Sequence, residues 1–93
     1  MKFLVIYDIS DDGNRNWFSE VLLDMGLKRV QYSCFLGDLS FPEAQLIESF
    51  AKGILDVESD SVIIIPLCSS CFDRVKTVVC SKSVFSDQEV LVL

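Results

Sequence analysis

Strand-length apolar runs alternate with helix-periodic segments along this 93-residue chain, and that order leaves few folds open to it. The first apolar run covers residues 3–9. A polar stretch follows in which Ser10, Asp11 or Asp12 is expected to cap a helix. Apolar side chains then recur at helical spacing between Phe18 and Met25, and Gly26 is placed to end the helix. The same alternation continues toward the C-terminus, which indicates an α+β domain.

Residues 29–36 alternate two kinds of side chain, which predicts a half-buried strand or a kinked pair of short strands. The expected apolar face comprises Val30, Tyr32, Cys34 and Leu36. Arg29, Ser33 and Phe35 fall on the opposite, chemically mixed face.

A second helix is predicted from Ser40 onward. Ser40 is its cap, Pro42 sits in the first turn, and Glu43 follows the cap by three residues. An apolar stripe between Ile47 and Ile54 supports the same helix.

The rest of the chain has three further strand signals. Residues 62–65 predict a short buried strand that Pro66 ends. Residues 75–79 form another strand-like run, and residues 90–93 form an apolar strand whose unpaired edge would invite aggregation.

These elements predict a ferredoxin-like βαββαβ sandwich over residues 1–80, with two helices on one face of an antiparallel sheet. Residues 81–93 form a C-terminal segment whose strand is expected to pair across subunits or with a partner. The uncovered sheet face and the short chain favour a homodimer.

Composition narrows the range of functions that the chain could have. The net charge of −6 argues against a simple nucleic-acid binder, which usually has a basic face. No apolar stretch approaches the roughly 20 residues that span a membrane, and the N-terminus has no signal-peptide pattern. We therefore expect a cytoplasmic protein without membrane contact, whose four cysteines are reduced thiols.

The residue types favour metal-assisted chemistry on phosphate esters. The chain has no histidine, which removes the Ser-His and Cys-His nucleophilic pairs. Its four glycines are scattered, so no phosphate-binding loop is formed. Carboxylates, arginines and a hydroxyl remain, and these suit Mg²⁺ or Mn²⁺ acting on a phosphodiester.

Asp8 is the principal candidate site residue. A strand buried on both faces does not easily keep a carboxylate inside, so we expect Asp8 at the strand end, facing a cleft or a partner chain. A two-fold axis near Asp8 would let two copies hold one ion. The alternative is that Asp8 caps the turn into the first helix. Asp11 and Asp12 are interpreted as cap and helix-dipole residues.

Basic and aromatic residues near that end give weaker signals. Arg15 and the pair Lys28-Arg29 are expected near the Asp8 end of the sheet, where they would contact phosphates; a solvated surface is the alternative. Trp17 and Phe18 are interpreted as packing residues.

Cys68-Ser69-Ser70-Cys71 has the spacing of half a zinc knuckle. A second cysteine pair at suitable spacing and a histidine are both missing, so buried or turn thiols are the preferred interpretation.

Three segments also carry a family resemblance. Residues 7–12 read YDISDD, Arg15 follows, and residues 26–39 read GLKRVQYSCFLGDL. Later, Ile65-Pro66-Leu67-Cys68 is followed by Cys71. Taken together, these residues closely resemble the CRISPR-associated Cas2 family, the small adaptation subunit with a virulence-associated-protein-D-like ferredoxin fold.

The resemblance implies a homodimer in which Asp8 faces its symmetry mate and binds Mg²⁺ or Mn²⁺. Some family members are metal-dependent endonucleases on single-stranded RNA or double-stranded DNA, and others bridge dimers of the Cas1 integrase on the DNA duplex. The positions that match residues assisting a nuclease are Tyr7, Arg15, Arg29, Ser33 and Phe35. Two positions depart from the family pattern: Trp17 replaces a frequent basic residue and Leu36 a frequent Glu.

Two functions follow, and we favour the first. In the first, a dimeric adaptor presents duplex DNA to the Cas1 integrase, with phosphate contacts from Arg15, Lys28, Arg29 and Lys76. In the second, an Asp8 pair holds the ion of an endonuclease, and Arg15 or Arg29 stabilises the transition state. A toxin-like mRNA interferase or a small regulatory domain is a third interpretation, because fold does not fix function.

Overall fold

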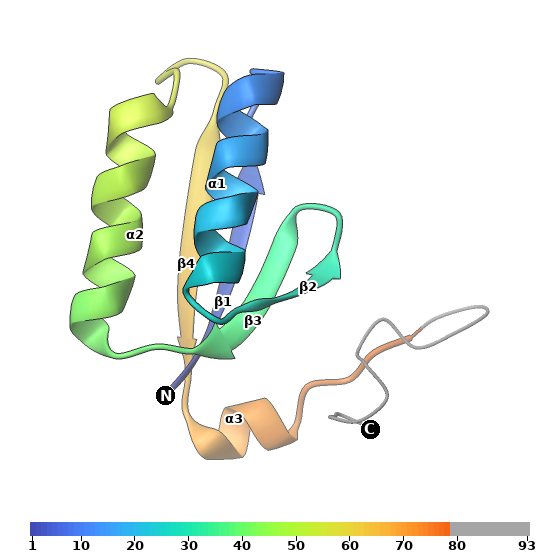
Figure 1. Cartoon of the computed structure of the whole chain (residues 1–93). Coiled ribbons are helices and arrows are strands. Elements are labelled where there is room, and N and C mark those ends of the chain that lie inside the picture. Colours follow the sequence, from blue (N-terminus) through green and yellow to red (C-terminus); the bar gives the residue numbers. More distant parts are fainter. Residues whose placement is uncertain (79–93) are drawn as a thin grey trace.

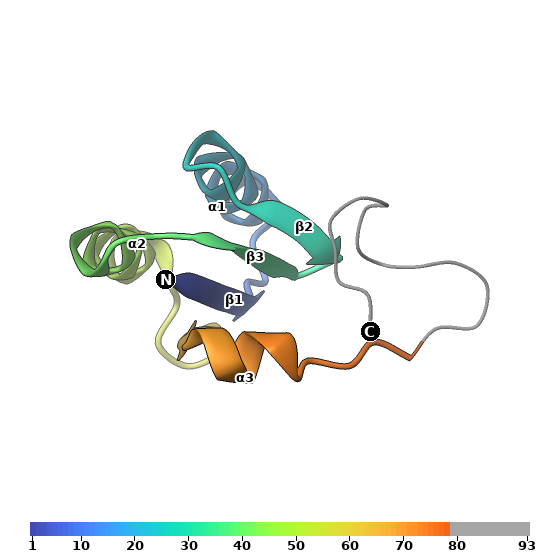
Figure 2. The same cartoon turned by 90° about the horizontal axis from the view of Figure 1, so that it is seen from below.

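The computed structural model describes residues 1–78, in which four strands and three helices follow one another along the chain. Their bounds are β1 (Lys2–Asp8), α1 (Asp12–Asp24), β2 (Lys28–Gln31), β3 (Cys34–Asp38), α2 (Phe41–Ile54), β4 (Ser61–Leu67) and α3 (Ser69–Asp73). The strands form one sheet in the order β2-β3-β1-β4, with each neighbouring pair antiparallel. α1 and α2 lie over one face, and α3 lies on the other side of the sheet (Figure 1, Figure 2). This is the predicted ferredoxin-like βαββαβ sandwich.

The side chains of β1 alternate between the two faces of the sheet. Phe3, Val5 and Tyr7 are buried beneath the helices, whereas Leu4 and Ile6 are only half-buried on the other face. The interpretation of this run as a strand buried on both faces is therefore wrong, because the helices cover one face only. We call the opposite side the open face.

Both long helices begin where the sequence predicts. The Asp11 carboxylate accepts a hydrogen bond from the backbone N–H of Asn14 at 2.8 Å and caps α1. Gly26 follows α1 with a positive φ of 93°, a conformation that favours glycine. Ser40 and Glu43 form a reciprocal capping box at the start of α2, which confirms the second predicted helix.

The alternating segment forms two strands joined by a turn at Tyr32 and Ser33, as one of the predicted alternatives stated. The assignment of its apolar face is wrong. Phe35 is 0% exposed, whereas Tyr32 is 69% exposed. Phe35 lies opposite Val5 of β1 and therefore points to the same helix-covered side. A register shift between Arg29 and Gln31 separates the alternation of β2 from that of β3.

The region around Pro66 also differs from the prediction. β4 is neither short nor ended by Pro66, since it continues to Leu67 with Pro66 opposite Phe3. Proline is tolerated there because β4 is an edge strand of the sheet that residues 1–78 form. Residues 75–78 of the next predicted strand lie in neither a helix nor a strand. Val79, the proposed domain limit at residue 80 and the strand at 90–93 lie outside the described residues.

Aromatic rings connect the layers of the core. Tyr7 packs edge-on against Phe18 of α1, with ring centroids 5.3 Å apart, and stacks on Phe35 at 6.1 Å. Trp17 contacts Phe50 of α2 at 5.8 Å, which confirms the packing interpretation of Trp17 and Phe18. Within residues 1–78, no helix combines the length and apolar character needed to cross a bilayer.

A substitution at Gly37 tests how closely the loop between α1 and β2 packs on β3. A Cβ at Gly37 would lie 2.9 Å from the Cα of Leu27, so Gly37→Ala should lower the free energy of unfolding by about 1–3 kcal/mol. The control Gly53→Ala adds a Cβ in α2 with no atom within 4 Å and should leave stability equal or raise it by up to about 1 kcal/mol. Equilibrium urea unfolding measures both, and equal effects would contradict the packing described.

Candidate functional site

Asp8 ends β1 on the open face, where its side chain is exposed. It lies opposite Ser61 of β4. Within residues 1–78 its carboxylate has no hydrogen bond or ion pair with another side chain or with the backbone. The alternative that Asp8 caps the first helix is wrong, because Asp11 supplies that cap. Asp8 is therefore an uncommitted carboxylate at the end of a strand.

The open face that leads to Asp8 is apolar. Strand register places side chains of three strands on this side of the sheet, in rows that cross β1. They are Leu4, Ile6, Leu36, Ile63 and Ile65. Ile63 is 52% exposed, and the other four are half-buried. In the part of the chain that the structure describes, only α3 approaches this face, at the end away from Asp8 (Figure 2).

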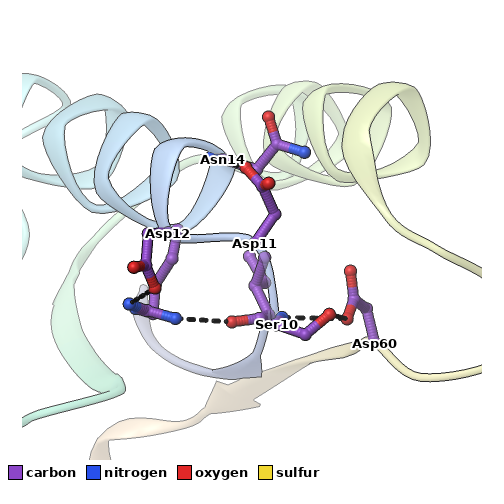
Figure 3. Close-up of polar contacts among 7 residues, drawn as sticks. Ser10, Asp11, Asp12, Asn14 and Asp60 are labelled. Atoms are coloured by element: carbon purple, nitrogen blue, oxygen red, sulfur yellow. Dashed lines mark hydrogen bonds and ion pairs between the residues drawn. The ribbon is translucent and has the colours of Figure 1, made fainter.

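Asp60 holds together two loops that flank Asp8. The backbone N–H and the hydroxyl of Ser10 donate to Asp60 Oδ1 at 3.0 and 2.9 Å (Figure 3). The backbone N–H of Asp56 donates to Oδ2 at 3.0 Å. These donors, the Asp56 N–H above all, lower the pKa of Asp60 to about 2. The β1–α1 loop is thereby joined to the loop before β4. Sequence reasoning missed this contact, because Ser10 and Asp60 are far apart in the chain and no motif links them.

Arg15 lies at the Asp8 end of β1, as predicted, but its guanidinium is engaged within its own loop. Nη1 donates to the carbonyl oxygen of Ile9 at 3.0 Å, and Nη2 pairs with the carboxylate of Asp12. The hydrogen bond to Asp12 is the main reason why the pKa of Arg15 is raised. Asp12 stands in the first turn of α1, which agrees with its interpretation as a helix-dipole residue.

Of the two basic residues in β2, only Arg29 reaches the Asp8 end of the sheet. Lys28 lies opposite Leu36, which in turn pairs with Leu4 in the middle of β1, so the position expected for Lys28 is wrong. The side chain of Arg29 extends toward the turn after β2, where the carbonyl oxygen of Ser33 accepts the backbone N–H of Tyr7, the residue before Asp8. Its guanidinium lies 4.9 Å from the ring centroid of Phe35, and Nη1 donates to the carbonyl oxygen of Tyr32 at 2.8 Å.

Two of the predicted nucleic-acid contacts are core residues. Tyr7 is 4% exposed and Phe35 is 0% exposed, so neither ring is available to a nucleic acid, and this part of the prediction is wrong. Burial raises the pKa of Tyr7, and the nearby charge of Arg29 partly offsets that rise. Ser33 is half-buried, and its carbonyl oxygen accepts the backbone N–H of Tyr7 at 3.0 Å.

The sheet therefore divides the candidate residues. Asp8 projects from the open face, whereas Arg29 lies beside Phe35 on the helix-covered side and Arg15 is tied to Asp12. Residues 1–78 also contain no group of three or more acidic or cysteine side chains arranged to hold a metal ion. One protomer thus offers a single carboxylate at this site, without an uncommitted arginine beside it.

The remaining candidates, Cys68 and Cys71, lie at the start of α3. Both are exposed rather than buried. Leu67, the last residue of β4, pairs with Lys2, so the cysteines stand at the opposite end of the sheet from Asp8.

The fold and the site define the class of protein. A four-stranded antiparallel sheet covered on one face by two helices, with an acidic residue ending its first strand, is a ferredoxin-like α+β sandwich with an open sheet face. The family model described as CRISPR associated protein Cas2 matches residues 1–75. The chain belongs to the Cas2 family.

Curated relatives agree with this assignment. The chain is 41% identical over 71 residues to CRISPR-associated endoribonuclease Cas2 1 of Archaeoglobus fulgidus, covering 76% of each chain. It is 37% identical over 68 residues to CRISPR-associated endoribonuclease Cas2 of Korarchaeum cryptofilum, covering 73% of each chain.

Solved structures show the same fold. The crystal structure of Streptococcus pyogenes Cas2 at pH 6.5 superposes with a TM-score of 0.71 and 26% identity, covering 84% of this chain and 99% of that one. The hypothetical protein TT1823 from Thermus thermophilus superposes with a TM-score of 0.65 and 31% identity, covering 72% of this chain and 80% of that one.

The contacts of Asp60 make the free energy of unfolding depend on pH. Its pKa falls from an ordinary value of 3.8 to about 2 in the folded chain, so its contribution is fully present above about pH 4 and is lost as pH falls toward 2. Asp60→Asn should therefore be less stable than the wild type at neutral pH, and this difference should shrink as the pH falls through that window. Urea unfolding at about pH 7, 4 and 2.5 measures it; a difference independent of pH would contradict the role of the charged carboxylate.

Proposed function

We propose that this chain acts in CRISPR adaptation as a homodimeric adaptor that binds duplex DNA together with the Cas1 integrase. The observation that supports it best is the open face, where an apolar surface ends in the uncommitted carboxylate of Asp8. Such a face favours an occupant of its own kind, since two copies related by a two-fold axis present the same patch to each other. The membership in the Cas2 family agrees with this role.

The positions of the arginines favour the adaptor over a catalyst. Stabilisation of a phosphoryl transition state needs a cation aimed at the reacting group, and Arg15 already pairs with Asp12 while Arg29 stacks on Phe35. Contacts that only position a phosphate backbone make weaker demands, because a solvent-accessible charge suffices. Lys28, Arg29 and Lys76 are exposed and would supply such contacts, and Arg15 would add to them from the β1–α1 loop.

A second copy would also complete an ion site. Mg²⁺ and Mn²⁺ prefer oxygen ligands, and Mg²⁺ commonly binds one or two carboxylates while keeping several waters. The exposed Asp8 carboxylate suits that chemistry, and two copies would hold the ion where one alone would not. When bound, such an ion polarises a phosphoryl oxygen or activates a water. Asp8 would hold the ion, and the apolar residues beside it would keep the two chains together.

Metal-dependent endoribonuclease activity is the second candidate. Two observations favour it: the curated relatives are named endoribonucleases, and the carboxylate of Asp8 has no competing partner within residues 1–78. In this reaction two Asp8 side chains would hold Mg²⁺ or Mn²⁺ against single-stranded RNA. Arg15 would contribute to charge stabilisation only after it leaves Asp12.

A charged substitution on the open face tests whether this face forms the dimer interface. Ile63→Glu places a carboxylate in the apolar patch and should weaken self-association by roughly tenfold or more, because the charge would lose its hydration in the interface. The control Val57→Glu changes a residue that is 93% exposed in the loop before β4 and should leave the dimer intact. Sedimentation equilibrium measures both. A monomeric wild type, or an Ile63→Glu variant that dimerises normally, would contradict the proposal.

Asp8→Asn separates the two candidate functions. Spacer acquisition with Cas1 should continue, because the adaptor needs only the shape and phosphate contacts of the dimer. Any Mg²⁺-dependent cleavage of single-stranded RNA should fall by roughly a hundredfold or more, because the neutral amide is a poor ligand for the ion. The control Asp73→Asn removes an exposed carboxylate from α3 and should leave both readouts unchanged.

Two outcomes of the Asp8→Asn experiment would contradict one or the other candidate function. Loss of acquisition in Asp8→Asn, with dimerisation and duplex binding retained, would overturn the purely architectural role. Cleavage that survives the substitution would remove Asp8 from the nuclease proposal and indicate a contaminating enzyme.

A further inference from the structure

Cys68 and Cys71 form a pair of accessible thiols that the proposed adaptor role does not use. Cys68 immediately precedes α3 and Cys71 lies in its first turn. Residues three apart in a helical turn are neighbours on one face. The turn is closed by the backbone N–H of Phe72, which donates to the carbonyl oxygen of Cys68 at 2.8 Å. Both side chains are exposed, so small molecules can reach them from solvent.

The two thiols have different environments. The Ser70 hydroxyl lies 3.4 Å from Cys68 Sγ. Hydrogen bonds to the Cys68 sulfur, first from Ser70 and then from Cys71, lower the pKa of Cys68 to about 7. The interaction with Cys68 raises the pKa of Cys71. Cys34, by contrast, is half-buried, and burial raises its pKa. The pair therefore contains one thiol suited to attack and a second one within reach of it.

We propose that Cys68 and Cys71 are a redox-active dithiol that small-molecule disulfides oxidise reversibly to an intramolecular disulfide. The Cys68 thiolate attacks one sulfur of the external disulfide, forming a mixed disulfide and releasing one small thiolate. The Cys71 thiolate then attacks Cys68 Sγ, forming the Cys68–Cys71 bond and releasing the second small thiolate. Two electrons pass to the external disulfide, and the two cysteine protons end on the two small thiols.

The surroundings favour this chemistry over metal binding. Two thiolates are half of the usual four-ligand zinc set, and no third cysteine or carboxylate within residues 1–78 completes a cluster with them. Phe72, which follows Cys71, connects the dithiol to the start of β1, because its ring centroid lies 5.2 Å from the Lys2 ammonium. Its chemistry is independent of Asp8, which stands at the other end of β1.

The test uses the full reduced chain and oxidised glutathione as the probe, without oxygen, with free thiols alkylated after an acid quench. Cleavage after lysine and arginine separates the cysteines: residues 53–74 hold Cys68 and Cys71, whereas Cys34 and Cys80 fall on other peptides. We expect peptide 53–74 to lose two hydrogen atoms and to gain no glutathione. Reduced glutathione in excess should restore both thiols.

Variants test the order of the steps. Cys71→Ser should trap glutathione on peptide 53–74, because no second thiol displaces it. Cys68→Ser should react roughly threefold more slowly at neutral pH, since the larger thiolate fraction of Cys68 outweighs its lower intrinsic nucleophilicity. Ser70→Ala should shift the pH–rate profile of Cys68 alkylation toward higher pH, because the hydrogen bond that lowers the pKa of Cys68 is lost. The control Cys34→Ser should change neither the rate of disulfide formation nor its product.

Three results would overturn the proposal. They are glutathione retained on the wild-type peptide 53–74, a disulfide that joins this peptide to the one holding Cys80, and oxidation of Cys68→Ser at the wild-type rate. The first would mean that Cys71 does not reach Cys68. The second would assign the disulfide to a different pair, and the third would show that Cys68 has no special reactivity.

Discussion

The packing of α1 and α2 against a single face of the sheet is the constraint from which the rest of the structure follows. Val5 and Phe35 of the sheet are completely buried against Leu22 and Ile47 of the helices. Because side chains alternate along a strand, this packing sends every second residue of β1 to the other face. The apolar residues there remain partly exposed, and Asp8 at the strand end remains in contact with water. The partly exposed apolar face and the uncommitted carboxylate thus have one cause.

Charge distribution adds a second level of organisation. Ion pairs within residues 1–78 include Lys2 with Asp38, Arg15 with Asp12, and Lys52 with Glu48. Exposed pairs of this kind add little to stability, but they reduce the positive charge that a bound anion experiences. The chain carries a net charge of −6, so duplex binding would rely on a few exposed cations and on the geometry of an assembly. The proposed adaptor, which would bind the duplex together with the Cas1 integrase, agrees with this balance.

Predictions from sequence succeeded where the determining interactions are local. The capping box of Ser40 and Glu43 lies within one helical turn, and the cap of Asp11 involves a neighbour three residues away. Predictions failed where two distant segments meet. The burial of Phe35 depends on its register with Val5, and the tolerance of Pro66 depends on β4 being an edge strand. The Asp60 contacts to Ser10 and Asp56 likewise depend on how the loops meet.

The sequence by itself determined the order of the elements, the starts of both long helices and the place of Asp8 at the end of the first strand, because periodicity, capping and residue chemistry act over a few neighbouring positions. Only the tertiary structure decided which face each strand residue occupies and which cations remain available. It placed Asp8 on the open face and Arg29 on the helix-covered side. The physical reason is that strand register and layer packing arise from contacts between residues far apart in the chain, and a shift of one position would exchange the two faces.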